Sequence, residues 1–453
     1  MPAPADLIAQ LDECKGLFED QPARRTERLL KQIRRTRFTQ SAELISLHET
    51  LLFLRAYPQN AQVAALCDEI LFRFSRRLRG LAPEQLAEFE YADVSGIAGT
   101  GLTTNFSYVF ARSLAARYPP PASTKGSGAK RNSRNQNPSL RIDWDRFTHA
   151  DQLAGVLAAL LPEAREDWAI GRHADWRKRY ESASPESAAG SIQWLLDRVR
   201  PDIYDLLEVP LRFELGDSAA SRSRARIPRR AMFYHASPLL SRRDVSFAYE
   251  FASSPIPVAR LPLARARHIL GVIIDASAVR YRELYGFEYP DEARVFHADL
   301  GRGVDFFFFG VPRRWRLPHR EYSAGMYFKN GVPVGYVEVM WAGGVMEVGF
   351  NLYYTFRQGE TAWLYARLLK LFRQQFGVEA FTIDPYQLGQ DNDEAIESGA
   401  FWFYAKLGFR PTSEHIRKLA EREERRILAD PAYRTPARTL RKLAEAPIIY
   451  RAE

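Results

Sequence analysis

The sequence predicts an α+β protein: an all-helical N-terminal region, then a mixed, mainly antiparallel sheet flanked by helices, then a helical C-terminal tail. Three observations lead to this prediction. Apolar residues recur at helical spacing through residues 5–92. Three apolar, aromatic-rich runs separated by short turns lie between residues 323 and 354, which is typical of an antiparallel meander. The charged segment 414–445 has helical spacing and is broken at Asp430-Pro431.

The 453 residues are enough for two or three domains. We expect a helical domain at 1–118, a flexible linker at 119–139, a second helical segment at 140–226 and an α/β domain with a helical tail at 227–453. The linker has almost no apolar residue. It therefore cannot bury enough surface to offset the entropy lost on ordering.

The two cysteines, Cys14 and Cys67, lie inside helical apolar patterns, and no Cys/His spacing typical of a metal site occurs. We therefore expect no metal and no disulfide framework, which fits the reducing cytoplasm. The N-terminus does not read as a secretory signal, and no run approaches the ~18 apolar residues of a membrane span. The sequence predicts a cytoplasmic protein.

A basic helical run extends from Arg24 to Arg37, and the net charge of the chain is +9. Two interpretations are open: a solvated helix face with its leucine side inward, which we favour, or a site for an acidic partner. Most aromatic residues lie in core-like patterns and not among the basic runs, which disfavours nucleic-acid binding.

Short turn sequences set the limits of the three predicted strands of the meander. Its runs are Ser323–Lys329, Val332–Trp341 and Val345–Tyr354. Asn330-Gly331 separates the first two runs, and this pair is a strong signal for a type I′ hairpin because both central residues need a positive φ. Upstream, Val245–Phe251 has β character, and Val304–Gly310 is expected to be a strand buried on both faces.

The third run leads into a polar loop, 355–361, and the loop opens a helix that ends at Gly377. The first turn of a helix leaves backbone N–H groups unpaired at the positive end of its dipole, so a phosphate is stabilised there. Gly359 allows close approach of the backbone, and Arg357 offers a bidentate charged contact. The strand Ala380–Ile383 and a helix at Glu394–Leu407 follow.

The helix at Glu394–Leu407 ends in the sequence Phe403-Tyr404-Ala405-Lys406-Leu407-Gly408-Phe409. Together with the order of elements, this makes residues 322–412 resemble the C-terminal half of a GNAT-type N-acyltransferase domain. The resemblance implies that the loop grips the pyrophosphate of acetyl-CoA or another acyl-CoA. The implied cofactor-binding residues are Arg357, Gln358, Gly359, Glu360, Thr361 and Ala362. Glu360 departs from the motif, because it stands where the family has glycine and its carboxylate would repel a pyrophosphate.

The resemblance also implies catalytic residues. In this family a tyrosine at the position of Tyr404 protonates the departing thiolate; the alternative is that Tyr404 fills the core beside other aromatics. The general base should be a carboxylate near the splayed strand, and Glu347 and Glu338 lie in suitable runs. The polar cluster after the strand supplies candidates for binding the acceptor: Asp384, Tyr386, Gln387 and Asn392. Residues at Asp391-Asn392 can instead cap the following helix.

The expected function is therefore an acyl-CoA-dependent N-acyltransferase that transfers an acyl group directly from a thioester to a small-molecule or protein amine. One alternative is a non-catalytic binding or scaffold protein that retains the architecture and has lost CoA binding. Another is a basic protein that associates with nucleic acid through Arg24–Arg37 and the linker.

Overall fold

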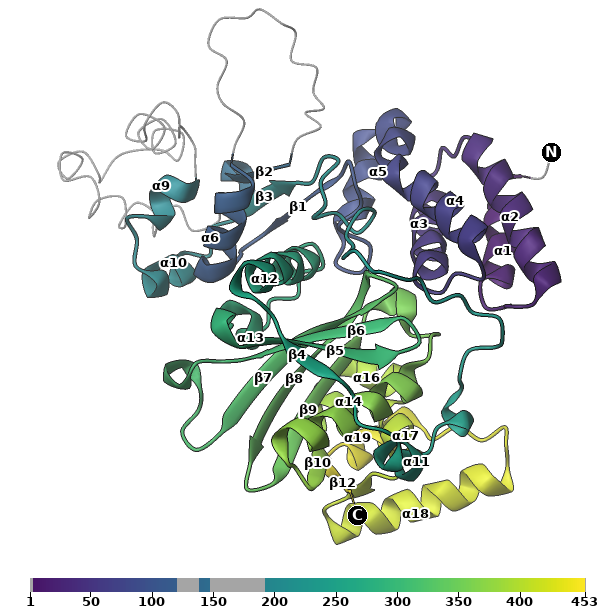
Figure 1. Cartoon of the computed structure of the whole chain (residues 1–453), viewed down its shortest axis with the longest axis vertical. Coiled ribbons are helices and arrows are strands. Elements are labelled where there is room, and N and C mark those ends of the chain that lie inside the picture. Colours follow the sequence, from purple (N-terminus) through teal and green to yellow (C-terminus); the bar gives the residue numbers. More distant parts are fainter. Residues whose placement is uncertain (1–2, 120–137, 147–191, 453) are drawn as a thin grey trace, which may run out of the picture. The chain divides into compact units, whose positions relative to one another are not determined.

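The computed structural model describes residues 3–119, 138–146 and 192–452 (Figure 1). The chain forms two compact units. Unit 1 is Met1–Arg230 with Tyr234–Ser237 and Arg267–Glu288; unit 2 is Ala231–Phe233, Pro238–Ala266 and Tyr289–Glu453. The predicted linker and much of the second helical segment lie outside the described residues.

Unit 1 begins with helices, as predicted. They are α1 (Pro4–Cys14), α2 (Asp20–Arg35), α3 (Ser41–Ala56), α4 (Ala61–Phe72), the 3-10 helix η1 (Phe74–Gly80), α5 (Pro83–Ala87), η2 (Glu88–Glu90) and α6 (Tyr108–Arg117). α3 is buried on most of its surface because α1 and α4 both pack against it. Cys14 and Cys67 are buried free thiols in this helical core.

A small antiparallel sheet completes unit 1, with β3 (Leu211–Glu214) between β1 (Gly101–Thr104) and β2 (Ser139–Ile142). The start of the segment expected to be helical from residue 140 is thus a strand, because Leu140 and Ile142 alternate inward and pair with β3. The 3-10 helix η3 (Trp144–Arg146) and the helices α9 (Ile192–Leu196) and α10 (Pro201–Leu207) follow.

Unit 2 is built on a nine-stranded sheet, and its strand order is β11-β12-β10-β9-β8-β7-β6-β5-β4. The strands are β4 (Val258–Arg260), β5 (Val295–Gly301), β6 (Val304–Gly310), β7 (Glu321–Lys329), β8 (Val332–Ala342), β9 (Val345–Leu352), β10 (Ala380–Ile383), β11 (Arg410–Pro411) and β12 (Ile448–Arg451). Among these described strands, neighbours are antiparallel except for β9 and β10, which are parallel.

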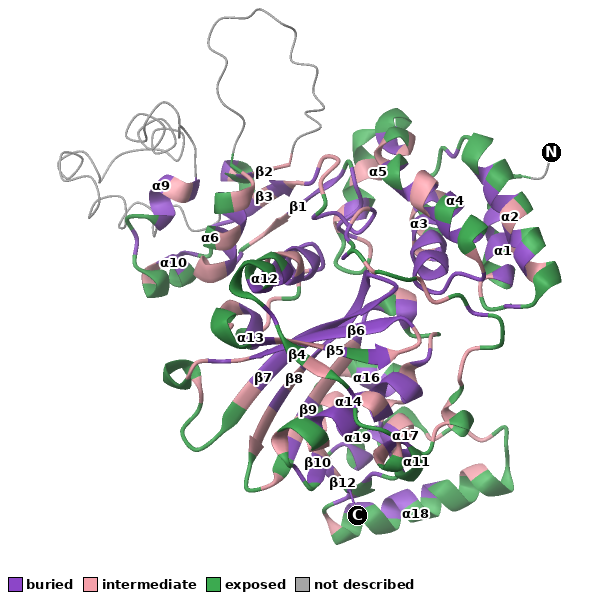
Figure 2. Ribbon diagram, viewed as in Figure 1, coloured by how far each residue is buried: buried purple, intermediate pink, exposed green. Residues whose placement is uncertain are grey.

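The predicted hairpin at Asn330-Gly331 is confirmed. Lys329 pairs with Val332, and the two residues between them have φ angles of 50° and 82°. β6 has the predicted bounds and is buried on both faces along most of its length (Figure 2).

The remaining described helices belong to unit 2, apart from their residues within Arg267–Glu288, which belong to unit 1. They are η6 (Arg242–Asp244), α11 (Phe247–Ala252), α12 (Leu263–Ala278), α13 (Tyr285–Glu288), η7 (Glu292–Arg294), η8 (Arg313–Trp315), η9 (Tyr354–Phe356), α14 (Thr361–Phe376), α15 (Pro385–Leu388), α16 (Asp393–Ser398), α17 (Ala400–Ala405), α18 (Glu414–Ala429) and α19 (Ala437–Leu443). α14 packs on one face of the sheet, where its Tyr365 ring lies 4.9 Å from Phe350 of β9 and its Phe376 ring 4.4 Å from Trp341 of β8.

Two sequence predictions about these helices are wrong. Val245–Phe251 is not a strand: Ser246 caps the helix α11 by accepting a hydrogen bond from the Tyr249 amide. The helix expected at Glu394–Leu407 is broken into α16 and α17 at Gly399, whose φ of 66° is left-handed.

The C-terminal tail has the predicted form. α18 is exposed except for a stripe that includes Ile416 and Leu419 (Figure 2), and β12 inserts between β10 and β11. The α+β class, with N-terminal helices, a mostly antiparallel mixed sheet and C-terminal helices, is confirmed. Within the described ranges, the chain has no helix with the length and apolar character needed to cross a membrane.

Candidate functional site

The parallel pair β9 and β10 separates part of the way along. Thr382 of β10 pairs with Glu347 of β9, and β10 ends one residue later at Ile383. β9 continues to Leu352, still paired with β8 on its other edge. The second half of β9 therefore has a backbone edge, facing β10, that no described strand covers.

The side chain of Gln387, from α15, occupies that edge. Its Nε2 donates to the Val348 carbonyl at 3.2 Å, and its Oε1 accepts from the Phe350 amide at 3.3 Å. A primary amide offers one donor group and one acceptor, so Gln387 continues the hydrogen-bond pattern that a neighbouring strand would provide. Gly349, between these two residues, lies against the amide: a Cβ added there would be 3.2 Å from Nε2.

The loop after β9 leads into the first turn of α14. Its Thr361 hydroxyl donates to the Arg357 carbonyl at 3.1 Å, and the Leu364 amide donates to the Glu360 carbonyl at 2.9 Å. Among the described residues, the first-turn amides of Thr361, Ala362 and Trp363 have no backbone acceptor, as expected for a helix N-terminus. Gln358 is exposed and Gly359 half-buried.

Glu360 is directed away from solvent into a buried ionic cluster. Its carboxylate accepts from Arg302 Nε at 3.0 Å and from the Leu240 amide at 3.2 Å, and it lies 3.6 Å from Lys329 Nζ. The side chains of Glu360 and Lys329 are 3% and 1% exposed. Burial alone would raise the pKa of Glu360, but the Arg302 bond and the two cations lower it.

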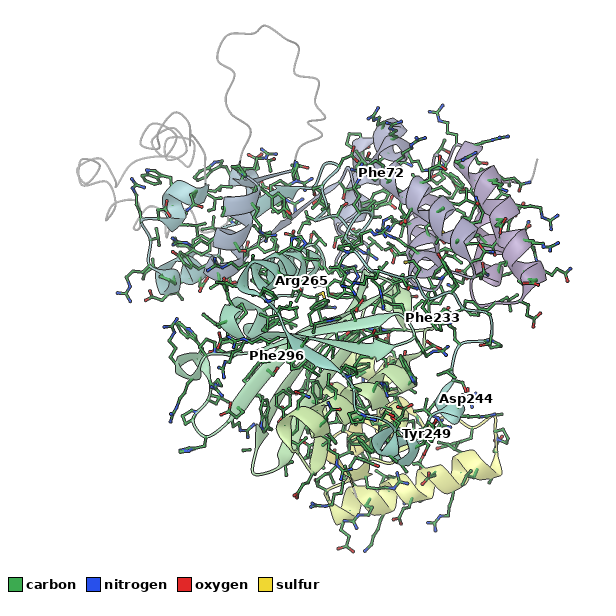
Figure 3. The ribbon with its side chains drawn as sticks, in the orientation of Figure 1. Phe72, Phe233, Asp244, Tyr249, Arg265 and Phe296 are labelled. Atoms are coloured by element: carbon green, nitrogen blue, oxygen red, sulfur yellow. The ribbon has the colours of Figure 1, made fainter. Side chains whose placement is uncertain are left out.

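An aromatic ring adds to this cluster. Phe233, labelled in Figure 3, lies 5.1 Å from the Arg302 guanidinium and 5.0 Å from Lys329 Nζ. The charge of Glu360 is thus neutralised within the cluster, and the cluster fixes the start of α14 to the β5–β6 and β7–β8 turns.

Arg357 is bound to Glu394 of α16, and the two side chains are 39% and 57% exposed. Its guanidinium also lies 5.8 Å from the Tyr354 ring. An exposed pair of this kind contributes little to stability and exchanges partners readily. Arg357 is therefore available to a stronger anion that displaces Glu394.

Glu338 and Glu347 share one face of the sheet. Glu338 is directly opposite Gly349 in the β8–β9 register, and Glu347 is two residues before Gly349. Glu338 accepts a 2.5 Å hydrogen bond from the Tyr322 hydroxyl. Burial, and then the nearby charge of Asp384, raise the pKa of Glu347, while Arg320 at 3.8 Å opposes them. The pKa of Glu347 is thus moved toward that of a general base.

Tyr404 lies on the other side of β9, in an aromatic cluster with Tyr365. The Tyr365 ring is 4.9 Å from Phe350 and 5.6 Å from Tyr404, so it connects α17 to the uncovered part of β9. Burial raises the pKa values of both phenols. Among the described residues, neither the fully buried Tyr365 hydroxyl nor the Tyr404 hydroxyl has a hydrogen-bond partner.

Two of the four predicted acceptor-binding residues act as helix caps. Asp384 accepts from the Tyr386 amide at 2.8 Å, and Asn392 accepts from the Ala395 amide at 3.2 Å. Tyr386 is 58% exposed. Only Gln387, of these four, contacts β9 directly through the hydrogen bonds described above.

Sequence reasoning did not identify Tyr365, Arg302 or Lys329 as part of this region. Tyr365 belonged to a helical apolar stripe, which gives no sign of an unpaired hydroxyl. Glu360 could have predicted that cationic side chains such as Arg302 and Lys329 lie nearby, because a buried carboxylate requires a partner of opposite charge.

Comparisons of the chain with models of known families, with curated proteins and with solved structures found no match. In the described part of the chain, no group of three or more His, Cys, Asp or Glu side chains is arranged to hold a metal ion.

Proposed function

We propose that the protein is an acyl-CoA-dependent N-acyltransferase whose active site lies beside the second half of β9. The observation that carries this proposal is the early end of the β9–β10 pairing next to the first turn of α14. This arrangement places a strand edge, occupied only by the Gln387 side chain, beside the N-terminus of a helix. The predicted order of a meander, a phosphate-binding loop and a Tyr-bearing helix agrees with it.

The donor would occupy the position of the Gln387 amide. Its thioester carbonyl would accept from the Phe350 amide once Gln387 swings out, so backbone N–H would polarise the reacting carbon. The pyrophosphate would lie against the first-turn amides of Thr361, Ala362 and Trp363, with Arg357 exchanging Glu394 for phosphate oxygens. The carboxylate of Glu360 does not oppose this, since it is buried with Arg302 and Lys329.

Transfer would proceed in one displacement. Glu347 accepts a proton from the ammonium group of the acceptor, and the free amine then attacks the thioester carbon. The C–N bond forms and the C–S bond breaks, the thiolate takes a proton from Tyr404, and the proton lost from the new amide nitrogen restores the Tyr404 hydroxyl. Glu338 is the second candidate for the base, because it lies on the same sheet face as Glu347.

The experiment that tests this proposal is an acyl-transfer assay on the full chain. Acetyl-CoA is mixed with small primary amines and, separately, with lysine-containing peptides, and two products are measured: free CoA thiol and the acetylated amine by mass spectrometry. Equal amounts of both products, with one acceptor class preferred, are expected. The proposal would be overturned if, with every acceptor, the native chain released no more thiol than the Tyr404→Phe and Glu347→Gln variants.

A non-catalytic binding or scaffold protein is the second candidate. It is favoured by the two contacts that close the site, Gln387 on Phe350 and Glu394 on Arg357. If the chain has lost CoA binding, acetyl-CoA should not bind even to the double variant Gln387→Ala and Glu394→Gln, which removes both contacts. If the double variant binds acetyl-CoA and the native chain does not, the contacts form a closed state of a transferase site.

A further inference from the structure

Unit 1 contains a cavity at the end of α2 and along α4 and η1, and arginine is the commonest residue in its lining. Its volume is about 570 Å³, and the chain around it carries six arginines and one glutamate: Arg34, Arg37, Arg73, Arg76, Arg77 and Arg79, with Glu69. Phe72, labelled in Figure 3, is the last residue of α4 and directly precedes Arg73, which lines the cavity. The cavity lies within unit 1, so the inference does not depend on the transferase proposal.

One of these arginines holds the cavity together. Arg77 donates to the carbonyls of Ile33 at 2.9 Å and Thr36 at 3.0 Å, and its guanidinium lies 5.5 Å from the ring of Phe38. These bonds cap the C-terminal end of α2, where the Ile33 carbonyl also accepts from the Thr36 amide at 3.2 Å. Burial lowers the pKa of Arg77, as expected for a guanidinium taken out of water. The wall of the cavity is therefore built into the fold.

The remaining charge is poorly neutralised. Arg34 and Arg73 share the single carboxylate of Glu69, at 2.9 and 3.6 Å. The side chains of Arg37 and Arg76 make no hydrogen bond or ion pair with the residues that the structure describes. Like charges so close repel one another, and a bound anion would remove that repulsion.

We propose that this cavity binds a small molecule that carries two or more phosphate groups. Guanidinium groups match phosphate oxygens in bidentate pairs, and several in one concavity suit a ligand with adjacent phosphates. The volume is in the range of small-molecule sites. The lining aromatic Phe38 is only 4% exposed, so it offers no platform on which the bases of a nucleic acid could stack.

The test is calorimetric titration of the full chain with inorganic tripolyphosphate at physiological ionic strength. The test variant is Arg37→Ala with Arg76→Ala, two exposed arginines that the fold does not use. The control is Arg24→Ala with Arg28→Ala, which removes the same charge from exposed positions of α2 outside the cavity. We expect one saturable site, at least tenfold weaker in the test variant and within twofold of native in the control.

Three results would overturn the proposal: no saturable binding, an equal loss in both variants, or tighter binding of a single-stranded oligonucleotide than of tripolyphosphate. The last result would assign the basic surface to nucleic acid. Circular dichroism of both variants, with unchanged thermal midpoints, separates loss of ligand contacts from loss of fold.

Discussion

The side-chain amide of Gln387 hydrogen-bonds the backbone on both sides of Gly349, accepting from Phe350 N–H at 3.3 Å and donating to the carbonyl of Val348 at 3.2 Å. It stands where β10 would continue if it ran as far as β9 does. Because a side chain can rotate away without breaking strand pairing, this edge of β9 can open while the described sheet stays intact.

Replacing Gln387 by Ala tests whether the amide competes with the donor. Two hydrogen bonds are lost, so the free energy of unfolding should fall by about 1–2 kcal/mol. Acetyl-CoA should nevertheless bind about three- to tenfold more tightly, because it no longer displaces the amide. Gln390→Ala, at an exposed position of the same loop, is the control for both measurements. Weaker binding by the Gln387 variant would show that this side chain does not block the site.

Phenylalanine variants of Tyr404 and Tyr365 distinguish a hydroxyl that takes part in catalysis from one that only packs in the core. Tyr404→Phe should lower kcat by about 10²-fold or more, the size of a general-acid effect, with little change in thermal midpoint. Tyr365→Phe deletes a buried hydroxyl that has no partner, so kcat should stay unchanged and stability should stay equal or rise. Equal kcat values for the two variants would remove Tyr404 from the mechanism.

The pH dependence tests Glu347 as the base. Burial and the charge of Asp384 raise the pKa of Glu347, and the base is active when deprotonated, so kcat/KM should rise with pH through that pKa. Asp384→Asn keeps the helix-capping acceptor but removes the charge. The pKa of Glu347 then falls, and the acidic limb of the profile moves to lower pH. An unmoved limb would assign the base to another group, with Glu338 the next to test.

The buried cluster around Glu360 should stabilise unit 2. Glu360→Gln leaves Lys329 and Arg302 without their carboxylate, and removing one partner of a buried pair costs about 3–5 kcal/mol. Glu394→Gln breaks the exposed pair with Arg357 and should change stability by less than about 1 kcal/mol. Urea unfolding at pH 7 measures both changes in the free energy of unfolding.

The sign of the pH effect follows from the direction of the shift. Because the pKa of Glu360 is lowered in the folded protein, its contribution is present above its unfolded pKa and is lost as pH falls through the folded value. The difference between native and Glu360→Gln should therefore shrink in acid. A constant difference would mean that the carboxylate charge is not what stabilises the cluster.

Much of the sheet could be predicted from local pattern. Asn330-Gly331 determines a two-residue turn, and the unbroken apolar run of β6 indicates a strand buried on both faces. The errors came where packing outweighs propensity: Phe247 is part of a helix whose aromatic side packs on Tyr450, and Gly399 breaks a helix that its neighbours would continue.

The candidate site was predictable as a set of residues but not as an arrangement. The loop at Gly359 and the tyrosine at position 404 have local sequence signals. The pairing of Glu360 with Arg302 joins residues 58 positions apart, and the use of Gln387 as a substitute strand depends on where β10 ends. Contacts of this kind are set by the tertiary fold, and a single sequence carries no periodicity that reports them.

The most direct test of the central claim is calorimetric titration of acetyl-CoA into the native chain and two variants at Thr361. Thr361→Ala removes the hydroxyl and keeps the amide, whereas Thr361→Pro removes the amide at the first helical position, where proline is tolerated. We predict saturable one-to-one binding that Thr361→Ala retains and Thr361→Pro weakens at least tenfold. Absence of binding at millimolar acetyl-CoA, or equal affinity in all three proteins, would contradict the account.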